Sequence, residues 1–251
     1  MTAGDAFANA RVLITGTSSG IGRELARRLA APGVHLALVA RRAERLAALA
    51  PELTATGATV RTYRVDVRDR EAMARTVQDF AAQAGGLTHV IANAGISWGD
   101  RLLEGDSRDM AEVLETNVQG MLHTLAPAVP LMVARRSGQL VAISSVAGFR
   151  GIPNKGAYCA SKAAMRMLMD AFRPVVRPHG IRVTTICPGW FDSELTARNA
   201  YPMPFMVPVE RAAELTLRAI ARGRKTYVFP WQMRLVVPLL QRVPDRILPI
   251  H

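Results

Sequence analysis

Short apolar runs alternate along the chain with longer stretches in which apolar residues recur at helical spacing. Seven of these runs have the length and composition of strands: Arg11–Thr15, Val34–Ala40, Val60–Val65, Thr88–Ala92, Leu140–Ser144, Ile181–Cys187 and Thr226–Phe229. Strands that alternate with amphipathic helices are typical of βαβ units, whose strands run parallel. The pattern predicts an α/β fold of the Rossmann type, with one doubly wound sheet of seven parallel strands and helices on both of its faces.

The stretches between these strands predict helices at Arg23–Ala31, Ala43–Thr56, Arg70–Ala84, Asp106–Met132, Gly156–Val176, Val209–Arg222 and Trp231–Val243. Asp69 directly precedes one of them and is its expected N-cap. Pro127 and Pro130 should bend or end the long fourth helix, and Pro174 should distort the last turns of the fifth. No repeat or low-complexity linker divides the chain, so residues 1–251 are expected to form a single domain.

Residues 190–207 interrupt the helical periodicity with apolar and proline residues. Loops longer than about 12 to 15 residues are usually functional or disordered. We expect this segment to be a mobile lid, with Trp190, Phe191 and Phe205 forming an apolar wall around a substrate. A purely structural flap, or a surface for another protomer, is the alternative interpretation.

The last segment, residues 230–251, is unusually apolar and is flanked by arginines. The stretch from Glu210 to His251 contains eight arginine and lysine residues and three acidic residues, which gives it a net charge of +5. Such a tail could make peripheral contact with an anionic membrane surface. It could equally cap the core or pack on a partner subunit, and the sequence leaves all three alternatives open.

The formal net charge of the whole chain is +12, and nearly all of its positive charge is arginine. The arginines are scattered and are not interleaved with aromatic residues in one patch, which argues against nucleic acid as a partner. No run approaches the roughly 18 apolar residues of a membrane span, and the first residues lack the features of a signal peptide, so a cytoplasmic protein is expected. Cys159 and Cys187 lie outside any Cys-x-x-Cys or histidine-rich setting, which predicts packing residues and no metal site.

A glycine-rich turn follows the first strand and leads into a helix. It comprises Gly16, Thr17, Ser18, Ser19, Gly20, Ile21 and Gly22. Glycines let the backbone approach a pyrophosphate, and the helix N-terminus offers free N–H groups to it. The turn has three residues between its first two glycines, where the usual dinucleotide motif has one. A tight turn that only serves helix packing is the alternative.

The end of the second strand bears on the choice of dinucleotide. An NAD site usually has an acidic residue about twenty positions beyond the glycine motif, where it binds the ribose hydroxyls. This chain has Ala40-Arg41-Arg42 there. Arginine can pair with a ribose 2′-phosphate, so NADP(H) is expected in preference to NAD(H), with Arg41 more than Arg42 making the contact. A solvated helix start is the alternative.

Two further strand ends carry candidate cofactor contacts. Asp66 and Val67 follow the third strand, where the Asp66 carboxylate could accept a hydrogen bond from an adenine amino group. Asn93, Ala94 and Gly95 follow the fourth strand and form a small turn with exposed backbone, expected alongside the cofactor. Both positions lie where open α/β sheets bind ligands.

Tyr158 and Lys162 stand four residues apart and therefore share one face of a predicted helix, with Ser145 brought near from a preceding strand. A tyrosine has an unperturbed pKa of about 10, and a neighbouring ammonium favours its phenolate form. A serine hydroxyl can hold a carbonyl or alcohol oxygen while a proton moves. Asn117 lies inside a helical pattern, where asparagine is unfavourable, so it needs solvent or a polar partner.

Taken together, these motifs resemble the short-chain dehydrogenase/reductase family from Val12 to about Phe229. The resemblance rests on the glycine turn from Thr15, the Asn93-Ala-Gly turn, Asn117, Ser145, Tyr158-x-x-x-Lys162 and Pro188-Gly189, in the family's order and spacing. The family's Asn-Asn-Ala-Gly stands here as Ala92-Asn93-Ala94-Gly95. Its threonine after Pro-Gly, which binds the nicotinamide amide, is replaced by Ser193.

The resemblance implies a role for each matching residue. Tyr158 would be the acid/base for a ketone or secondary alcohol, Lys162 would assist it and bind the nicotinamide ribose, and Ser145, rather than Ser144, would hold the substrate oxygen. Asn117 would hold a water that links Lys162 to solvent. The implied function is an NADP(H)-dependent carbonyl reductase or alcohol dehydrogenase for a lipophilic small molecule, similar to hydroxysteroid dehydrogenases.

The resemblance also suggests a homodimer or homotetramer through the helices that bear Asn117 and Tyr158. A sensor or scaffold protein that binds NADPH without turnover is the alternative from another functional class. Such a protein would be expected to have lost part of the set Asn117, Ser145, Tyr158 and Lys162, and this chain has all four.

Overall fold

Seven parallel strands form one sheet in the order β3-β2-β1-β4-β5-β6-β7. The computed structural model describes residues 5–194, 196–198 and 203–242. The strands are β1 (Arg11–Thr15), β2 (His35–Ala40), β3 (Thr59–Arg64), β4 (His89–Ala92), β5 (Gly138–Ile143), β6 (Ile181–Pro188) and β7 (Thr226–Phe229). All seven predicted strands are present within two residues of their expected bounds, and the predicted doubly wound sheet is confirmed.

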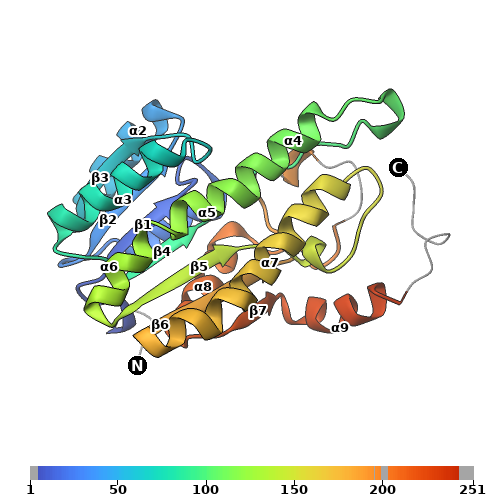
Figure 1. The fold of residues 1–251 in the computed structure, drawn as a ribbon. Helices are drawn as coiled ribbons and strands as arrows, with labels where there is room; N and C mark the ends of the chain where they lie inside the picture. The colour runs from blue at the N-terminus through green and yellow to red at the C-terminus, as the bar shows by residue number, and fades with distance from the viewer. Residues whose placement is uncertain (1–4, 195, 199–202, 243–251) are drawn as a thin grey trace.

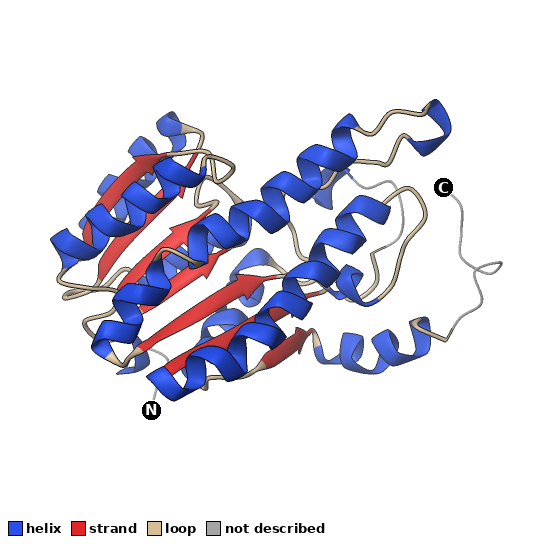
Figure 2. Cartoon of the chain, in the orientation of Figure 1, coloured by secondary structure: helices blue, strands red, loops and turns tan. Residues whose placement is uncertain are grey.

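Helices cover both faces of the sheet, as Figures 1 and 2 show. They are α1 (Gly20–Leu29), α2 (Ala43–Thr54), α3 (Arg70–Ala84), α4 (Arg108–Leu114), α5 (Gly120–Leu125), α6 (Ala128–Arg135), α7 (Gly156–Val176), α8 (Val209–Ala221) and α9 (Trp231–Leu240). Short 3₁₀ turns occur at Asp5–Phe7, Leu102–Glu104, Val146–Phe149, Arg177–His179 and Thr196–Arg198.

Two apolar layers hold the helices to the sheet. The layer on one face contains side chains of α1, α2 and α8, and the layer on the other contains side chains of α3, α5, α6 and α7. Successive residues of a strand serve opposite layers: in β1, Val12 and Ile14 belong to the first and Leu13 to the second. Each is completely buried, which is worth about 1.5 to 3 kcal/mol for an aliphatic side chain.

The strand order creates the crevice in which a ligand can bind. β1 and β4 are neighbours inside the sheet, with β2 and β3 added beyond β1 and β5 to β7 beyond β4. Connections from neighbouring strands therefore leave in opposite directions at the carboxyl ends of β1 and β4, which is where open α/β sheets bind ligands. The glycine turn follows β1 and the Asn93-Ala94-Gly95 turn follows β4, so both border this crevice.

The helix predicted from Asp106 to Met132 is divided, and the break expected at Pro127 is present, whereas Pro130 lies inside α6 and the π-helical turn was not predicted. It consists of α4, a π-helical turn at Glu115–Gln119, and α5, and Pro127 separates α5 from α6. A proline cannot supply the N–H that would continue the helix. The π-helical turn carries Asn117, and such turns are frequent at functional sites.

Other helix ends agree more closely with the sequence. The Asp69 side chain accepts a hydrogen bond from the Ala72 amide at 2.9 Å, so the predicted cap of α3 is confirmed. Helix α7 runs through Pro174 to Val176 and continues into a 3₁₀ turn. Helix α1 begins at Gly20, three residues before its predicted start, so the glycine turn itself supplies the first helical turn.

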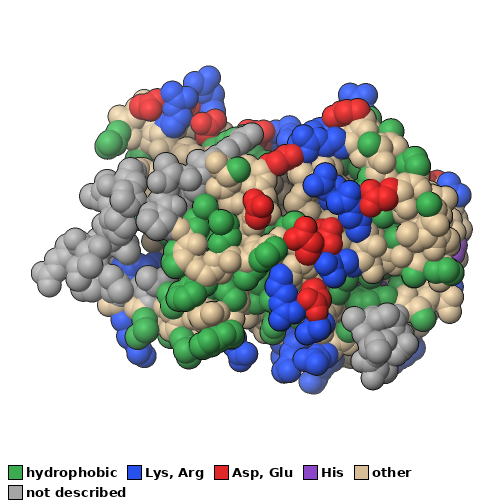
Figure 3. Space-filling view, turned by 180° about the vertical axis from the view of Figure 1, so that it is seen from behind, with side chains coloured by type: hydrophobic (Ala, Val, Ile, Leu, Met, Phe, Trp, Pro, Cys, Tyr) green, Lys and Arg blue, Asp and Glu red, His purple; other side chains and the backbone are tan. Residues whose placement is uncertain are grey.

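The described part of the C-terminal tail is helix α9. Met233 and Val237 of α9 are buried, whereas Trp231, Leu235 and Leu239, spaced four residues apart, are about two thirds exposed. Helix α9 lies at the lower right of Figure 1, which becomes the lower left in Figure 3 because that view is from behind, and hydrophobic side chains gather there. One face of α9 therefore packs on the fold and the opposite face is open, while residues 243–251 of the predicted tail lie outside the described residues.

Candidate active site

A cavity of about 480 Å³ lies at the carboxyl ends of the central strands. Most of the residues singled out in the sequence line it: Gly16, Ser18, Ser19, Gly20, Ile21, Arg41, Asp66, Val67, Asn93, Ala94, Gly95, Ser145, Tyr158, Lys162, Pro188, Gly189, Trp190, Phe191 and Ser193. Thr17, Gly22, Asn117 and Phe205 are not among its lining residues. The glycine turn and the pair of Tyr158 and Lys162, far apart in the sequence, thus share one cavity.

The glycine turn is locked against the turn that follows β4. Asn93 Nδ2 donates to the carbonyl oxygens of Thr15 (2.9 Å) and Gly16 (3.3 Å). Gly16 has φ +75°, and a Cβ there would lie 2.8 Å from both Ala94 Cα and Asn93 Nδ2. Gly22 also packs against the Asn93 side-chain amide, where a Cβ would clash with Nδ2. This close backbone approach allows only glycine and leaves the N-terminus of α1 facing the cavity, so the turn fits a dinucleotide pyrophosphate.

Arg42, more than Arg41, holds the glycine turn. Arg42 Nη2 donates to the hydroxyls of Ser18 and Ser19, each at 2.8 Å, and Arg42 Nη1 pairs with Glu194 Oε2 at 3.0 Å. Arg41 Nη1 lies 3.7 Å from Asp66 Oδ2. Both arginines line the cavity, so a phosphate there would meet two guanidinium groups that already have partners. The sequence did not indicate the contacts of Arg42, because Glu194 is 152 positions away.

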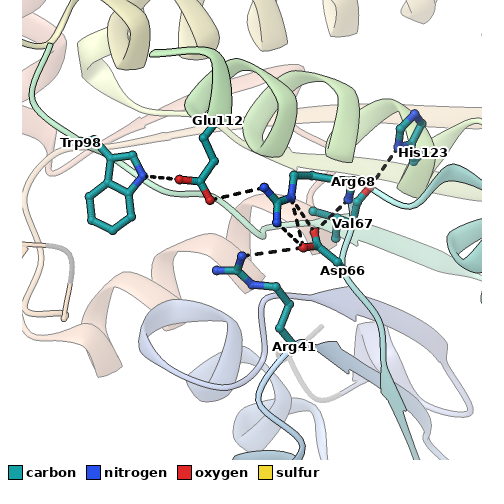
Figure 4. A network of polar contacts seen from close by, with 7 residues as sticks. All are labelled: Arg41, Asp66, Val67, Arg68, Trp98, Glu112 and His123. Carbon is teal, nitrogen blue, oxygen red and sulfur yellow. Dashed lines mark hydrogen bonds and ion pairs between the residues drawn. The ribbon is translucent and has the colours of Figure 1, made fainter. Parts of the chain in front are cut away.

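The Asp66 carboxylate is occupied by arginines, as Figure 4 shows. Arg68 Nη2 donates to Asp66 Oδ2 at 2.7 Å, and the Arg68 amide donates to Oδ1 at 3.0 Å. Burial raises the pKa of Asp66, but the hydrogen bonds from Arg68 outweigh it and hold the pKa below its usual value. Arg68 also reaches Glu112, which accepts from the Trp98 indole N–H at 3.0 Å. A network of polar contacts thus connects the end of β3 at Asp66 to the cavity wall near Trp98.

Lys162 and Tyr158 are neighbours on α7, as their spacing predicts. Lys162 Nζ lies 5.7 Å from the centre of the Tyr158 ring and donates to the Ile143 carbonyl at 3.0 Å. Burial lowers the pKa of Lys162 to about 8, because an ammonium loses its hydration there. A Cβ on Gly95 would lie 3.4 Å from Lys162 Nζ, so this glycine keeps the space beside the amine open.

The two neighbouring serines at the end of β5 have different environments. Ser144 is buried and donates from its hydroxyl to the Lys162 carbonyl at 2.8 Å. Both serines line the cavity, but the Ser145 hydroxyl oxygen accepts from the Ala147 amide at 3.1 Å, which leaves its own proton to be donated. This difference supports the choice of Ser145 as the residue that faces a substrate.

Asn117 is completely buried and has the polar partners that its position in a helix requires. Its Oδ1 accepts from the Ile96 amide at 2.8 Å, and its Nδ2 donates to the Ile96 carbonyl (3.0 Å) and to Ser161 Oγ (2.9 Å). A Cβ on Gly95 would lie 3.1 Å from Asn117 Oδ1, so the asparagine stands directly behind the glycine that borders Lys162. Its contacts fix the course of the chain after β4.

The predicted lid is only partly described, since Leu195 and residues 199–202 lie outside the described residues. Its two ends are joined: the Val207 amide donates to the Trp190 carbonyl at 3.1 Å. Trp190 and Phe191 line the cavity, as expected, whereas Phe205 is about half exposed and lies outside its lining. Phe205 lies in a turn at Pro204–Phe205, and its place in a substrate wall stays a prediction.

Several lining residues were not foreseen. Lys155 and Arg150 carry charge into the cavity, and Ile96, Trp98 and Met233 add apolar surface. Lys155 lies three residues before Tyr158, which is one helical turn and a signal that the spacing could have given. Met233 comes from α9 at the far end of the chain, and no local pattern indicates that it reaches this cavity.

Both cysteines are free thiols, and Cys159 and Cys187 are buried among packing residues, which confirms their expected role. Among the described residues, no three or more His, Cys, Asp or Glu side chains are grouped so that they could hold a metal ion. Within the same part of the chain, no helix is long and apolar enough to cross a membrane.

Comparison with known proteins agrees with this geometry. The family model for short chain dehydrogenases matches residues 10–202. An uncharacterized oxidoreductase of Myxococcus xanthus is 40% identical over 233 residues, which are 93% of this chain and 92% of the relative. Dehydrogenase/reductase SDR family member 7B of Bos taurus is 38% identical over 194 residues, 75% of this chain and 60% of the relative.

Solved structures give the same result. A short chain dehydrogenase/reductase of Burkholderia phymatum, in complex with NAD, is similar with a TM-score of 0.86 and 26% identity, over 96% of this chain and 98% of that one. A short-chain type dehydrogenase/reductase of Mycobacterium marinum has a TM-score of 0.82 and 28% identity, over 91% of this chain and 97% of that one. The chain therefore belongs to the short-chain dehydrogenase/reductase family of NAD(P)-dependent oxidoreductases.

Proposed function

We propose that the protein is an NADP(H)-dependent oxidoreductase that interconverts a ketone and a secondary alcohol, with Tyr158 as the acid/base. The observation that carries this proposal is the shared cavity: Ser145, Tyr158 and Lys162 line the same space as the glycine turn that fits a dinucleotide. Apolar walls from Trp98, Trp190 and other residues favour a lipophilic small molecule as the substrate.

The residues that would hold the cofactor come from successive strand ends. Backbone amides of residues 16–22 bind the pyrophosphate, Arg41 with Arg42 binds the 2′-phosphate, and residues 66–67 and 93–95 line the adenosine and ribose side. Pro188, Gly189 and Ser193 face the nicotinamide end. When bound, the nicotinamide donates or accepts the hydride.

The protein's own side chains handle the proton. Ser145 holds the substrate oxygen, and the Tyr158 hydroxyl gives that oxygen a proton during reduction or takes one during oxidation. The Lys162 amine, 5.7 Å from the tyrosine ring, favours the phenolate by its charge and binds the ribose. Asn117 orders the chain behind Gly95 and holds the water through which Lys162 exchanges protons with solvent.

Replacement of Tyr158 by Phe tests the acid/base role. NADPH oxidation measured against a panel of ketones should fall by about two to four orders of magnitude in kcat, the range expected for loss of a general acid. Tyr227→Phe is the matched control, because Tyr227 lies on β7 outside the cavity lining and should retain full activity. Wild-type turnover that is unchanged in Tyr158→Phe would exclude this mechanism.

Substitution of the two arginines tests the cofactor preference. Arg41→Asp should weaken NADPH binding much more than NADH binding, measured as dissociation constants by titration, because only NADPH has a phosphate for the arginine to pair with. Arg42→Asp is the informative comparison, since Arg42 also holds Ser18 and Ser19 and should weaken both cofactors. Equal losses for both cofactors in Arg41→Asp would show that Arg41 does not recognise the phosphate.

A protein that binds NADPH as a sensor or scaffold remains the second functional class. It would bind NADPH with the same arginine dependence but would turn over no carbonyl compound. The complete set of Asn117, Ser145, Tyr158 and Lys162 favours the enzyme, because binding alone does not need an acid/base pair. Binding of NADPH without turnover across the ketone panel would favour the sensor.

The exposed surfaces support two kinds of association. Met167 and Val175 are exposed apolar residues on α7, the helix through which we propose a homodimer or homotetramer. The open face of α9, with Trp231, Leu235 and Leu239, has exposed Arg234 beside it, which suits peripheral contact with an anionic membrane on its cytoplasmic side. Light scattering tests the first proposal. Co-sedimentation with anionic and neutral vesicles tests the second, and equal partitioning would exclude it.

On the face drawn in Figure 3, positive and negative side chains are interspersed. Nucleic-acid surfaces instead concentrate positive charge along the path of the phosphates. This arrangement supports a small molecule, and not a nucleic acid, as the ligand of the protein.

A further inference from the structure

The part of the cavity near Tyr158 is lined by cations and not by carboxylates. Arg150, Lys155 and Lys162 contribute positive charge there. The two acidic residues among the cavity lining, Asp66 and Glu194, each lie in ion pairs with arginines. Arg150 already takes part in a further interaction, and the Lys162 amine donates to the Ile143 carbonyl. Lys155 is therefore the cation near Tyr158 whose charge the two carboxylates of the lining do not neutralise.

Lys155 is placed and held so that its ammonium faces this end of the cavity. It occupies the N-cap position of α7, and its Nζ donates to Ser97 Oγ at 3.3 Å. Within the described part of the chain, no carboxylate lies within 4.0 Å of this nitrogen. The nearby Asp100 raises the pKa of Lys155, but burial has the larger effect and leaves the pKa below its usual value.

Asp100 is already committed to another partner. Its carboxylate accepts hydrogen bonds from the amides of Gly156 and Ala157, at the first turn of α7. A carboxylate that accepts hydrogen bonds from the first amides of a helix stabilises the start of that helix, and the same hydrogen bonds and the helix dipole hold the carboxylate in place. Asp100 therefore orders the segment that carries Lys155 without forming an ion pair with it, which leaves the ammonium available to an anion from outside.

Arg150, which precedes Ile152 in the sequence, is a second positively charged residue of the cavity lining. It follows the short helix that starts after Ser145, in an extended conformation with φ −155° and ψ 149°. Ile152, between the two cations in the sequence, is partly exposed and also lines the cavity. Apolar surface from Ile96, Trp98 and Met233 continues from there toward Tyr158.

We infer that the substrate carries a carboxylate, and that Lys155 binds this carboxylate while the apolar walls hold the rest of the molecule and Tyr158 faces its carbonyl group. This inference rests on the proposed function and narrows the substrate class to oxo acids with an apolar body, or the corresponding hydroxy acids. The Lys155 ammonium has three N–H donors, and Ser97 accepts from one of them. A substrate carboxylate would supply further acceptors.

Matched pairs of acids and esters test the inference. The substrates are levulinate, 5-oxohexanoate and 4-acetylbenzoate, each beside its methyl ester, which keeps the carbonyl group and removes the charge. For at least one pair, the acid should have a kcat/KM at least about tenfold higher than the ester, the effect expected for a partly exposed charged hydrogen bond. Lys155→Met should abolish this preference and raise KM for the acid, and Lys155→Arg should restore most of it.

Lys225→Met is the matched control, because Lys225 is an exposed lysine outside the cavity lining. It should keep the wild-type preference for the acid. An ester that is used as well as its acid by the wild type in every pair, or a Lys155→Met variant that keeps the preference, would overturn the inference.

A binding measurement separates this inference from the proposed reaction. Calorimetric titration of the NADPH-bound protein with each acid and its ester should show tighter binding of the acid in the wild type and loss of this difference in Lys155→Met. If the acids bind selectively but are not reduced, the anion site stands and the proposed function fails. If ketones are reduced without any difference in binding between acids and esters, the proposed function stands and the anion site fails.

Discussion

Replacement of Lys162 by Met should make the cofactor-free protein more stable although it removes activity. The wild-type chain buries a lysine ammonium beside Tyr158, where burial lowers its pKa to about 8 from 10.5. A buried charge is costly because it loses its hydration, and the Ile143 carbonyl compensates only in part. Methionine has a similar length and no charge to desolvate.

The expected gain follows from proton linkage. Each pKa unit corresponds to about 1.4 kcal/mol, so holding Lys162 in the folded chain at pH 7 costs about 3 kcal/mol relative to a neutral side chain. Methionine would leave the Ile143 carbonyl without this donor, which costs about 1 kcal/mol. The net effect is a variant that is more stable by about 2 kcal/mol, or about 4 to 8 °C in Tm for a chain of this size.

The sign of the pH dependence provides a second readout. Because the folded-state pKa lies below the unfolded-state value, the unfolded chain binds more protons between about pH 8 and 10.5. Wild-type stability should therefore rise with pH in this window, and its difference from Lys162→Met should shrink by about 2 kcal/mol between pH 7 and 9.5.

Urea unfolding followed by circular dichroism at pH 7 and 9.5, at one fixed protein concentration, measures both effects. Lys225→Met serves as the control, because an exposed lysine should change stability little at either pH. A Lys162→Met variant that is less stable than the wild type at pH 7, or a difference that does not change with pH, would refute the reasoning.

Three further substitutions test individual contacts. Asn117→Ala should lower the free energy of unfolding by about 2 to 4 kcal/mol, because the buried amide and carbonyl of Ile96 lose their partners; an unchanged urea midpoint would contradict this. Asp69→Ala removes the cap of α3 and should cost about 1 kcal/mol with kcat unchanged, so a loss of activity would show a role that the geometry does not indicate. Glu194→Gln removes a carboxylate that pairs with Arg42 and should tighten NADPH binding severalfold more than NADH binding, whereas equal effects in titrations of both cofactors would show that this ion pair does not compete with the phosphate.

The parts of the fold that could be predicted depend on residues close together in the sequence. The strand Arg11–Thr15 and the glycine turn after it form one continuous pattern, so a few neighbouring residues predict both the strand and the dinucleotide expected at the turn. Tyr158 and Lys162 are related by helical spacing, which places them side by side before any tertiary contact is known. The cap by Asp69 is similarly local.

Contacts between distant segments could not be predicted in this way. The pairing of Arg42 with Glu194 depends on the loop after β6 returning over the start of α2. A local contact was also missed: Arg68 binds Asp66 two residues away, where the position at a strand end had indicated a contact with adenine instead. The apolar character of Phe205 indicates burial, whereas the residue is about half exposed in a turn that composition does not reveal.

The position of β1 between β2 and β4 also affects the order in which the protein can fold during synthesis. Once Arg64 has left the ribosome, β1, β2 and β3 can pair as a three-stranded unit, but the other edge of β1 stays bare until β4 is made at His89–Ala92. An unpaired edge of apolar residues can join with the edge of another chain. The nascent protein therefore exposes this edge to other chains while α3 is being synthesised, long before the segment that contains Tyr158 exists.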